Sequence, residues 1–517
     1  MTKIRHLYVF IILAIIAAWL PGVNARNWVP HPKSSTPEFV KCMEFRNTPC
    51  LEPRDREWDQ YAATYNIRVP VTPKFIALPR SIDEVALAME CVHICGLTAQ
   101  AKSGGHSYGS FSNGGFDGEV VVDLREMQTV HVDSRTNVAR VDGGLRLGNL
   151  AVALYQQGER ALAHGSCAGV GIGGHFTHGG YGFASRAWGL GLDQIIGLDV
   201  VLANGSIRYA SQDNNTELFY GMRGAADSVG IAARFHLNAQ KAPAAVVNFR
   251  LDASDATHST DATVAAFLTV QDFVHNKKHN AVDSKLGFSI SLQYNQFSLS
   301  GIYLGTLEEF NTKVRPAMVE GLPNATVDAK QLDWLSSLVD QNDGQPLEIA
   351  EPYTARANFY AKSVIVPEPG LDADQIRPYI DFILNTDSPT PFFAYFDLWG
   401  GAGSFINKQY KHWTAFPHRD SLWVAQHYAW VDNNATFPKE GINYIHNLND
   451  FLGRAVDTAA NFKRMYKSYF GYLDPLMRPD KARDRYYDRY TDKQLRILKS
   501  KVDYGNRFRN PYTFEHN

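Results

Sequence analysis

The chain has 517 residues, which is enough for two or three domain-sized units with a large buried core. Hydrophobic residues make up 45% and charged residues 20%, a composition typical of globular proteins rather than of disordered, fibrous or membrane-spanning ones. With 51 basic and 53 acidic residues the formal net charge is -2, so the sequence has no electrostatic footprint for nucleic acid or an anionic membrane. These numbers favour a small, roughly neutral substrate.

The first 25 residues are typical of a secretory signal peptide. Lys3 and Arg5 precede an apolar run over residues 7–20, and the small residues Val23 and Ala25 fit cleavage after Ala25. The alternative is a membrane anchor, but the run is shorter than the ~20 residues that span hydrocarbon. We therefore expect a secreted, extracellular protein without a membrane contact after cleavage. Four sequons give weak further support and mark candidate glycosylation sites: Asn204, Asn214, Asn324 and Asn434.

Export bears on the five cysteines, because disulfides persist in oxidising compartments. Cys42, Cys50, Cys91 and Cys95 lie close together in the sequence, whereas Cys167 stands apart. An odd cysteine in a secreted protein needs an explanation of its own, and the pairing of the other four cannot be deduced from their positions.

The first clear predicted element is a helix that begins at Ser81, which forms a capping box with Glu84, and ends at Gly96. Four apolar residues at helical spacing predict one buried face: Val85, Ala88, Met89 and Val92. A short strand over residues 97–103 and a buried strand over residues 120–122 follow. Asn204-Gly205 divides residues 198–209 into a hairpin, because both residues accept positive φ. Mixed α+β structure is expected up to about residue 242.

Beyond an Ala-Pro-rich stretch at residues 241–245, strand-like runs such as 288–292 alternate with helical segments such as 264–274. This alternation indicates a second, sheet-bearing domain. Near the end, Thr491 and Gln494 form another predicted capping box, followed by a helix with one apolar face: Leu495, Leu498 and Val502. The sequence does not say on which domain this final segment packs.

Two glycine-rich loops carry the strongest chemical signal. The first, Ser103-Gly104-Gly105-His106-Ser107-Tyr108, follows a predicted strand, and its adjacent glycines let backbone amides approach an anion such as pyrophosphate. Alone, a Gly-Gly-His turn is more often structural. The second loop runs from Gly165 to Gly182 and contains Cys167. It also contains His175 and His178, but in a glycine-rich loop these lack the helical frame that would aim both at one ion, so we expect no metal.

With these loops the chain resembles the FAD-linked oxidases of the vanillyl-alcohol oxidase superfamily and, within it, the berberine-bridge-enzyme-like family. The resemblance runs from about Cys42 to Pro511 and is closest to the bicovalent oxidases of glucose-, xylose- or chitin-type oligosaccharides. It rests on five segments in order: SGGHSYGS, GSCAGVGIGGHFTHGGYGF, LDVVLANGS, ELFYGMRGA and NRFRNP.

The resemblance implies an α+β fold with two domains after the signal peptide of residues 1–25. The first is a two-subdomain PCMH-type FAD-binding domain over residues 26–242, with its core at about 70–242. The second is a substrate domain over residues 243–455, an antiparallel sheet with helices on one face. A C-terminal segment over residues 456–517 is expected to return to the FAD domain.

The resemblance also implies one FAD that is held by two covalent bonds, from His106 to the flavin 8α-methyl and from Cys167 to flavin C6. This would explain the lone cysteine. A disulfide between Cys42 and Cys91 is implied as well, whereas Cys50 and Cys95 depart from the family pattern and a second bridge between them stays open. Further implied cofactor-binding residues are Ser103, Gly104, Gly105, Ser107, Val170, Gly171, Gly174, Gly180, Tyr181, Gly230 and Ile231. The small side chain of Val170, at a position that controls oxygen access in the family, implies an oxidase.

Hydride transfer from a carbinol carbon to a flavin needs a base for the hydroxyl proton. Tyr472 matches the family's catalytic tyrosine, and Asp397 matches a carboxylate partner. A phenol with a pKa near ~10 needs such a partner, or an environment that favours its anion, at neutral pH. Tyr108 and Gln426 match substrate-contacting positions. Tyr395, a further candidate substrate residue, stands with Phe393 where relatives carry glutamine and tryptophan, which leaves the exact sugar open.

The leading expectation is a secreted FAD-dependent oxidase that converts the C1 hydroxyl of an oligosaccharide to a lactone and reduces O2 to H2O2. A second reading keeps the flavin but assigns an alcohol-bearing specialised metabolite, which is oxidised or oxidatively cyclised. A third is a non-catalytic secreted binding protein with a vestigial flavin domain. The sequence gives neither the sugar and its chain length nor the oligomeric state and biological role.

Overall fold

The strands form four sheets within residues 37–460 and 465–515, which the computed structural model describes. The expected signal peptide lies outside these residues. No helix in the described ranges is long and apolar enough to cross a membrane.

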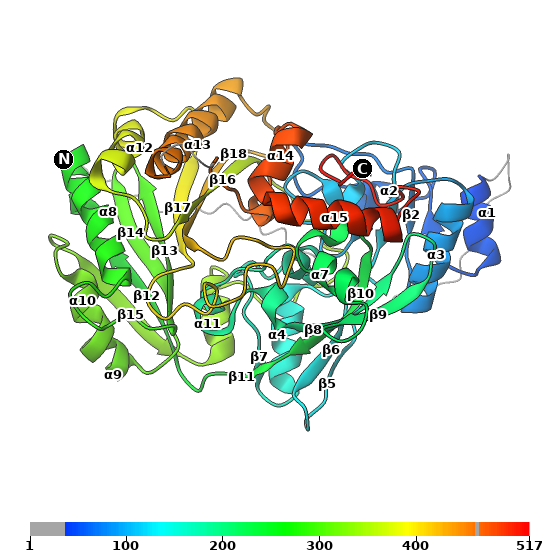
Figure 1. Cartoon of the computed structure of the whole chain (residues 1–517), viewed down its shortest axis with the longest axis horizontal. Helices are drawn as coiled ribbons and strands as arrows, with labels where there is room; N and C mark the ends of the chain where they lie inside the picture. The colour runs from blue at the N-terminus through cyan, green and yellow to red at the C-terminus, as the bar shows by residue number, and fades with distance from the viewer. Residues whose placement is uncertain (1–36, 461–464, 516–517) are drawn as a thin grey trace. The chain divides into compact units, whose positions relative to one another are not determined.

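The first sheet has the strand order β1-β2-β4-β3 and is parallel except where β1 pairs with β2. Its strands are β1 (Cys50–Leu51), β2 (Phe75–Ala77), β3 (Ala99–Lys102) and β4 (Val120–Asp123), and its helices are α1 (Glu38–Phe45), α2 (Trp58–Ala62) and α3 (Ile82–Ile94). Apolar residues of α1 and α3 share a core with β2 and β4, and both helices lie beside β2 in Figure 1. Because β3 ends at Lys102, the first glycine loop begins directly at its carboxyl end.

The second sheet is antiparallel, with the order β5-β6-β10-β8-β9. Its strands are β5 (Val130–Val132), β6 (Val138–Asp142), β8 (Ile195–Val201), β9 (Ile207–Ser211) and β10 (Ile231–Asn238); a small separate sheet joins β7 (Arg160–Ala161) to β11 (Gln240–Lys241). The accompanying helices are α4 (Leu147–Gln156), α5 (Ile172–Thr177), α6 (Ser185–Trp188) and α7 (Thr216–Ala225). The second glycine loop contains α5, whose Phe176 is buried in this core.

The third sheet has the order β15-β12-β14-β13-β17-β18-β16 and is antiparallel throughout. Its strands are β12 (Val246–Asp252), β13 (Leu286–Gln293), β14 (Gln296–Tyr303), β15 (Thr326–Leu332), β16 (Asn358–Pro367), β17 (Phe392–Leu398) and β18 (Ser421–Val431). Its helices are α8 (Thr260–Val274), α9 (Leu307–Glu309), α10 (Arg315–Val319), α11 (Trp334–Gln341), α12 (Ala373–Asn385) and α13 (Lys439–Ala459). This is the expected antiparallel sheet.

The two faces of this sheet differ because side chains alternate along each strand. One face packs on α8, α12 and α13 and forms the largest apolar core, to which Ile290, Phe396 and Ala425 belong. The residues next to these point to the other face, which carries Ser289, Asp397 and Gln426. Ser289, Asp397 and Gln426 thus share the face opposite α8, α12 and α13.

The C-terminal segment carries α14 (Pro479–Tyr486) and α15 (Arg489–Val502), and Leu498 of α15 is buried in the core of the second sheet. Figure 1 shows α15 beside α7, and Phe508 is buried in the core of the first sheet. The backbone N–H of Ala99 in β3 donates to the carbonyl of Arg507 at 2.7 Å. The chain end therefore lies against the sheet from which the first glycine loop starts.

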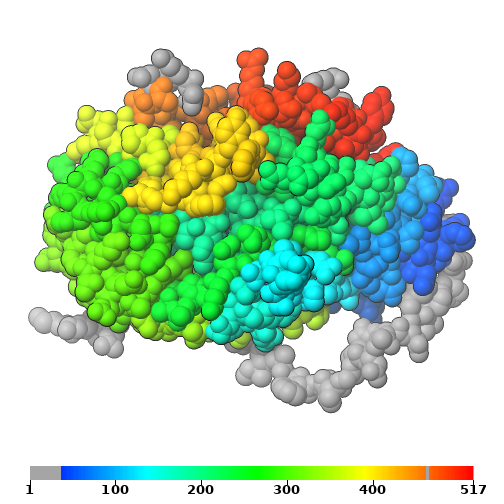
Figure 2. Space-filling view, turned by 60° about the horizontal axis from the view of Figure 1, so that its bottom comes forward, coloured from blue at the N-terminus to red at the C-terminus, as the bar shows by residue number. Residues whose placement is uncertain are grey.

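The connection between β17 and β18 packs on residues from the first half of the chain. Phe405 N donates to Arg186 O at 2.7 Å and Ala415 N to Tyr220 O at 3.2 Å, while Arg419 forms a buried ion pair with Asp193. In Figure 2 the yellow surface near residue 400 lies against green surface from the first half of the chain. This contact ties the third sheet to the glycine-loop region.

Most predicted elements are confirmed. Ser81 accepts from Glu84 N at the start of α3, and Gly96 ends that helix with φ +66. Gly205, with φ +81, turns the β8–β9 hairpin. The capping box at Thr491 and Gln494 is wrong, because Asp488 caps α15 by accepting from Thr491 N, and the helix begins earlier. Aspartate is as good a cap as threonine, and Thr491 is fully buried.

Candidate active site

The two glycine loops meet backbone to backbone. A Cβ atom on Gly104 would lie 2.2 Å from the N of Gly171, a distance that no real side chain tolerates. Ser103 Oγ accepts from the N–H of Gly173 at 3.2 Å, which links the same two loops a second time. Only glycine at both positions allows this contact, so the sequence requirement for glycine is steric.

Arg146 holds both loops and was not found from the sequence. Its Nη1 donates to the carbonyl oxygens of Gly104 at 2.8 Å and Gly169 at 2.6 Å, and its Nε donates to Glu351 at 2.6 Å. Arg146 is buried, so these charge-assisted bonds are shielded from water. A single arginine before a helix is common, and its role depends on contacts that only the fold brings together.

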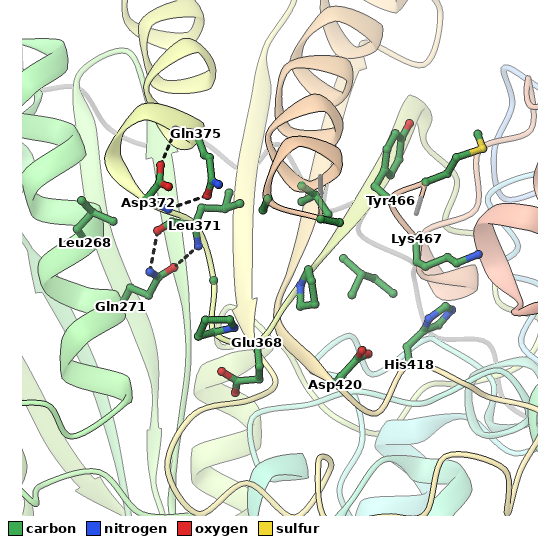
Figure 3. Close-up of a pocket in the computed structure, with 18 of the residues that line it drawn as sticks. Leu268, Gln271, Glu368, Leu371, Asp372, Gln375, His418, Asp420, Tyr466 and Lys467 are labelled. Carbon is green, nitrogen blue, oxygen red and sulfur yellow. Dashed lines mark hydrogen bonds between the residues drawn. The ribbon is translucent and has the colours of Figure 1, made fainter. Parts of the chain in front are cut away.

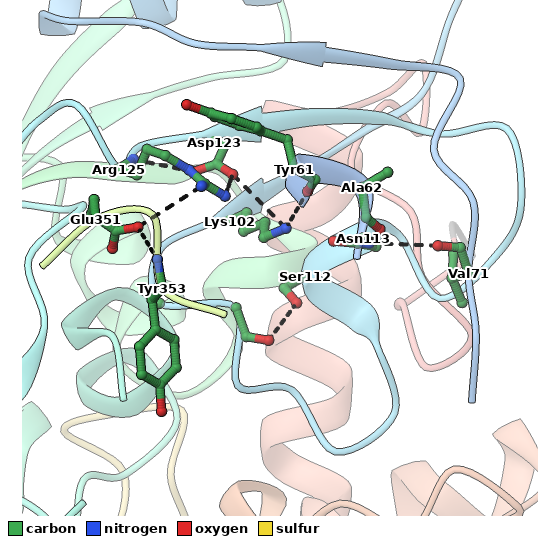
Figure 4. Close-up of polar contacts among 12 residues, drawn as sticks. Tyr61, Ala62, Val71, Lys102, Ser112, Asn113, Asp123, Arg125, Glu351 and Tyr353 are labelled. Carbon is green, nitrogen blue, oxygen red and sulfur yellow. Dashed lines mark hydrogen bonds and ion pairs between the residues drawn. The ribbon is translucent and has the colours of Figure 1, made fainter. Parts of the chain in front are cut away.

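A group of charged residues lies next to the first loop (Figure 4). Arg125 pairs with Asp123 at 2.7 Å, Lys102 lies 3.8 Å from the same carboxylate, and Arg125 Nη1 lies 3.8 Å from Glu351. Burial lowers the pKa of Lys102 to about 8. Each cation has a carboxylate partner, and these ion pairs hold the start of the first glycine loop in place.

His106 lies between two aromatic rings, with its centroid 4.0 Å from that of Tyr65 and 5.4 Å from that of Tyr353. Its Nε2 is buried and has no hydrogen-bond partner among the described residues. Burial, assisted by the positive charge of Arg146, lowers the pKa of His106 to about 3, so the imidazole is neutral. A neutral, rigidly stacked imidazole is suited to bond formation at carbon.

The donor set fits a flavin. Cys167 is a free thiol on an exposed residue of the second loop, and burial with the charge of Cys167 raises the pKa of Tyr65, the ring stacked on His106. The two predicted links therefore share a neighbourhood. His106 Nε2 has no protein partner and could bond to a cofactor. Gly104 and Gly171 have no side chains to keep a dinucleotide from the backbone amides.

The remaining predicted cofactor residues divide into two groups. Gly105, Ser107 and Val170 lie within the two loops, and Gly174 has open space where a Cβ would point. Gly180 N donates to Tyr469 and the hydroxyl of Tyr181 donates to the carbonyl of Leu398, so these two face the third sheet. Gly230 and Ile231 lie at the start of β10, where Ile231 is buried in the core with α3.

Tyr472 and Asp397 meet although they lie 75 positions apart in the sequence, with the phenol donating to Oδ2 at 2.8 Å. Ser289, opposite Asp397 in β13, donates to its other oxygen. Burial raises the pKa of Asp397 to about 6, and both hydrogen bonds act against that shift. The carboxylate is therefore ionised at neutral pH and ready to accept a proton.

Burial and the nearby charge of Asp397 raise the pKa of Tyr472 well above its usual value. The anion that the sequence left as one option is thus disfavoured, and the carboxylate partner is the option that the geometry supports. The other titratable groups influenced by Asp397 are tyrosines, all with raised pKa: Tyr108, Tyr181, Tyr395 and Tyr469. None of these phenols titrates near the pKa of Asp397.

Of the three predicted substrate residues, Gln426 and Tyr395 lie on this sheet face, and Tyr108 reaches it from the end of the first glycine loop. Gln426 Nε2 donates to the hydroxyl of Tyr108 at 3.0 Å, and Tyr395 is the direct cross-strand neighbour of Gln426. The Tyr108 and Tyr472 rings are stacked with centroids 6.3 Å apart. Polar groups that can bind hydroxyls therefore surround the phenol of Tyr472.

An unpredicted row of aromatic rings continues from these residues. Phe393 stacks on Tyr395 at 4.2 Å and on Tyr428 at 4.9 Å, and Tyr428 stacks on Phe359 at 4.6 Å. Phe359 in turn lies 5.9 Å from Tyr65. The row extends across β17, β18 and β16 toward His106, so the wall beside the site is apolar and flat. Aromatic content alone could not locate it.

The expectation that His175 and His178 lack a helical frame is wrong, because His175 lies in α5 and His178 caps the C-terminal end of that helix. Both side chains have protein partners. His175 Nε2 accepts from Gly165 N at 3.0 Å. The ring of His178 stacks on Phe470 at 4.5 Å, with its Nε2 3.2 Å from Asp227. Both side chains support the second loop.

Figure 3 shows residues that line a separate cavity of about 750 Å³. Its lining includes Gln271, whose side chain binds both backbone groups of Leu371, and Asp372, which forms a capping box with Gln375. Glu368 accepts from His275 and from the N–H of Gly401. These polar side chains hold the chain before α12, and the lining contains no residue of the glycine loops or of the Tyr472–Asp397 pair.

The structure also locates the other cysteines and the asparagines of the four sequons. Cys42 and Cys91 form a disulfide, the pairing that the resemblance implied, whereas Cys50 and Cys95 are free thiols and do not form the second bridge. The side chains of all four sequon asparagines are exposed: Asn204, Asn214, Asn324 and Asn434.

Residues 73–211 match the model of a family described as an FAD binding domain. Glucooligosaccharide oxidase from Sarocladium strictum is 30% identical over 525 aligned positions, which cover 100% of this chain and 99% of that protein. Xylooligosaccharide oxidase from Myceliophthora thermophila, solved with xylobiose, has a TM-score of 0.87 at 29% identity, over 93% of this chain and 100% of that one.

A solved glucooligosaccharide oxidase from Acremonium strictum, described as having a 6-S-cysteinyl, 8α-N1-histidyl FAD, has a TM-score of 0.86 at 30% identity. The match covers 93% of this chain and 99% of that chain. Fold, FAD-domain match and full-length similarity agree with the site geometry. The chain belongs to the family of FAD-linked oxidoreductases that contains the oligosaccharide oxidases and the berberine-bridge-enzyme-like proteins.

Proposed function

We propose that this protein is a secreted oxidase of oligosaccharides that carries one FAD on His106 and Cys167 and oxidises the anomeric C1 hydroxyl to a lactone. The observation that carries the proposal is the 2.8 Å hydrogen bond from Tyr472 to a carboxylate with a pKa of about 6, on the sheet face that also carries Gln426 and Tyr395. A general base is thus assembled among groups that bind hydroxyls.

The residues of this chain supply substrate binding and proton transfer. As Tyr472 takes the C1 hydroxyl proton, it passes its own proton to Oδ2 of Asp397, so neither phenolate nor free hydroxide is needed. Ser289 holds the other carboxylate oxygen and fixes the acceptor. A bound FAD would supply the hydride acceptor for C1 and the means to reduce O2 to H2O2.

Two covalent links to the flavin would suit a site that is open to solvent. A flavin that is tethered at His106 and Cys167 need not be enclosed to be retained, so the adjacent sheet face can stay open to a chain-like substrate. A Cβ added at Gly174 would meet nothing within 4 Å, and Cys167 is an exposed residue. Both observations support an open site.

We propose the domain division 26–242, 243–455 and 456–517, with a PCMH-type core at about 70–242 in the first part. The first two sheets and the third sheet fall on either side of residue 242, which supports it. Secretion after cleavage at residue 25 rests on the signal sequence, with support from the Cys42–Cys91 disulfide and the exposed sequons at Asn204, Asn214, Asn324 and Asn434.

One observation favours a second candidate, the oxidation of an alcohol-bearing specialised metabolite. The aromatic row from Tyr395 through Phe393 and Tyr428 makes the wall next to the base flat and apolar. Such a wall would also receive an aromatic or polycyclic body. Peroxide release with a panel of oligosaccharides, measured beside one of aryl and alkyl alcohols, separates the two candidates.

The cofactor is tested by intact mass and absorbance after deglycosylation and acid denaturation. Wild type should keep a yellow chromophore and the mass of one FAD, and His106→Ala or Cys167→Ala should each keep it through the remaining link. The double variant should lose it. Wild type that releases its flavin would leave the covalent assignment without support, and wild type without any flavin would favour a binding protein.

A further inference from the structure

The segment that ends in Tyr472 crosses the edge of the third sheet. β16 is the last strand in the sheet order, and residues 467–469 lie along it. Ile365 N donates to Lys467 O at 2.8 Å, and Tyr469 N donates to Ser363 Oγ at 3.0 Å. A short 3-10 turn, η6 (Phe470–Tyr472), follows immediately.

The chain then passes from one face of the sheet to the other within three residues. Tyr472 reaches Asp397 on the polar face. Asp474 instead contacts Tyr360 and Lys362, which alternate with Ser363 along β16 and point to the helix-covered face. Lys362 is the cross-strand neighbour of His427, whose ring is buried against α12 and α13. The segment that contains the turn therefore contacts both faces of β16.

Asp474 is fixed from several directions. Its Oδ1 accepts from Tyr360 at 3.0 Å and from Leu476 N at 2.9 Å, and its Oδ2 lies 3.3 Å from the ammonium of Lys362. Its backbone N donates to Tyr486, and its carbonyl accepts from Tyr512 at 2.6 Å. The Asp474 and Lys362 side chains are only 4% and 9% exposed, so water does not compete for the pair.

Lys362 has a second partner that fixes its position. Its ammonium lies 2.8 Å from Nδ1 of His446 on α13, and Nε2 of the same ring lies 3.2 Å from the Tyr360 hydroxyl. Arg68 covers the Tyr360 ring, with the guanidinium carbon 4.8 Å from its centroid. None of these groups is used by the proton transfer from substrate to Asp397, although they end two residues from Tyr472.

We propose that Asp474 and Lys362 are positioning residues, whose buried ion pair pins the turn from the far face of β16 and so holds the phenol of Tyr472 against Asp397. The inference rests on the proposed function, since it assigns the pair a task in the same reaction. A displaced phenol loses contact with both substrate and acceptor, and small displacements of a reacting group are costly. A buried pair permits one geometry only, because each partner left alone would be an uncompensated charge.

The test compares variants of the flavin-loaded protein. Asp474→Asn and Lys362→Met each remove one charge, and Tyr360→Phe removes a single hydrogen bond to Asp474 as a milder change. The matched control is Asp503→Asn, which breaks the fully buried pair, 2.5 Å apart, between Lys499 of α15 and Asp503 at the C-terminal end of that helix, away from the turn. Hydrogen exchange of the peptide around residues 466–476 is followed beside steady-state kinetics.

We expect Asp474→Asn and Lys362→Met to lower kcat by ~10- to 100-fold with KM within about twofold, and Tyr360→Phe to do so less. Exchange in the 466–476 peptide should accelerate. Because the hydrogen bond from Tyr472 lowers the pKa of Asp397, loosening the turn should also move the acidic limb of the pH profile upward. Asp503→Asn should lower the melting temperature but change neither the acidic limb of the pH profile nor the hydrogen exchange of the 466–476 peptide.

The proposal is overturned if Tyr360→Phe and Asp474→Asn leave both the limb and the exchange of the turn as in wild type. It is equally overturned if Asp503→Asn moves the limb as much as they do. If Asp474→Asn does not fold, Tyr360→Phe alone decides. Should wild type oxidise no sugar, the proposed function fails, yet the exchange data still show whether the pair pins the turn.

Discussion

The glycine loops and the polar face of the third sheet are held in place by different means. In the loops, main-chain atoms make the contacts: Gly104 packs on Gly171, and Arg146 binds two carbonyl oxygens. On the sheet face, side chains make them, as in the bonds of Tyr472 to Asp397 and of Gln426 to Tyr108. An added carbon should therefore damage the first region, whereas a removed oxygen should damage the second.

This difference predicts separate kinds of failure. Changes in the loops should alter how much flavin the protein carries, with turnover per bound flavin affected less. Changes on the sheet face should alter turnover at full flavin content. A variant that fails in the wrong way would show that the two regions are less independent than the contacts suggest.

The largest effect is expected for Tyr472→Phe, which keeps the ring and removes the hydroxyl that relays the proton. Loss of general base catalysis should lower kcat/KM by ~10²- to 10⁴-fold. Flavin content, measured by absorbance after denaturation, should match wild type. Stopped-flow reduction of the flavin by substrate is the direct readout.

The control for this variant is Tyr379→Phe. It removes the hydroxyl of a fully buried tyrosine, which lies 3.0 Å from His427 on the helix-covered face. Its kcat/KM should stay within about twofold of wild type, because a single neutral hydrogen bond is worth only ~1 kcal/mol of stability. Equal losses in the two variants would mean that the phenol of Tyr472 has no special role.

The second effect concerns the loops. Gly104→Ala places a Cβ 2.2 Å from a backbone nitrogen, so the loops must separate at a cost of ~1–3 kcal/mol. We expect flavin per protein to fall severalfold, measured by intact mass. Gly505→Ala lies outside the two loops and its Cβ would meet only the flexible side chain of Arg507, at 3.3 Å, so it is the control and should load fully. Full loading of Gly104→Ala would show that the loop contact is not what admits the cofactor.

The two regions also differ in how well the sequence predicts them. The loop residues are contiguous, and adjacent glycines beside His106 and Cys167 indicate their chemistry directly. Asp397 and Tyr472 each look like ordinary strand and core residues, because 75 positions separate them and only the order β17-β18-β16 brings them together. Without the family resemblance neither would have been chosen, and Arg146 was missed even with it.

The same reasoning explains the smaller errors. The helix start near Thr491 was misplaced because Asp488 and Thr491 are both good caps, and only the burial of Thr491 decides between them. The aromatic row through Phe393 and Tyr428 depends on cross-strand register, which periodicity within one strand does not give. Local patterns predict elements, whereas contacts between strands depend on the whole sheet.

The third prediction is a pH dependence that belongs to the sheet face alone. Asp397 must be ionised to accept the proton, and burial raises its pKa to about 6. kcat/KM should therefore be constant above that pH and fall about tenfold per unit below it, whereas flavin content should not change. Asp397→Asn should lower the rate at all pH values and abolish this acidic limb. A limb that persists in Asp397→Asn would belong to another group.

The smallest effect is expected for Tyr108→Phe. Tyr108 links the two regions because it is the last residue of the first loop and yet contacts Gln426. The change removes the acceptor of the 3.0 Å bond from Gln426 and leaves the ring stacked near Tyr472. One neutral hydrogen bond is worth ~1 kcal/mol, so KM should rise about fivefold while kcat stays within twofold. Steady-state kinetics on the best oligosaccharide measure both. An equal fall in kcat and kcat/KM would instead place the Tyr108 hydroxyl in the transition state, since an interaction made only there lowers both together.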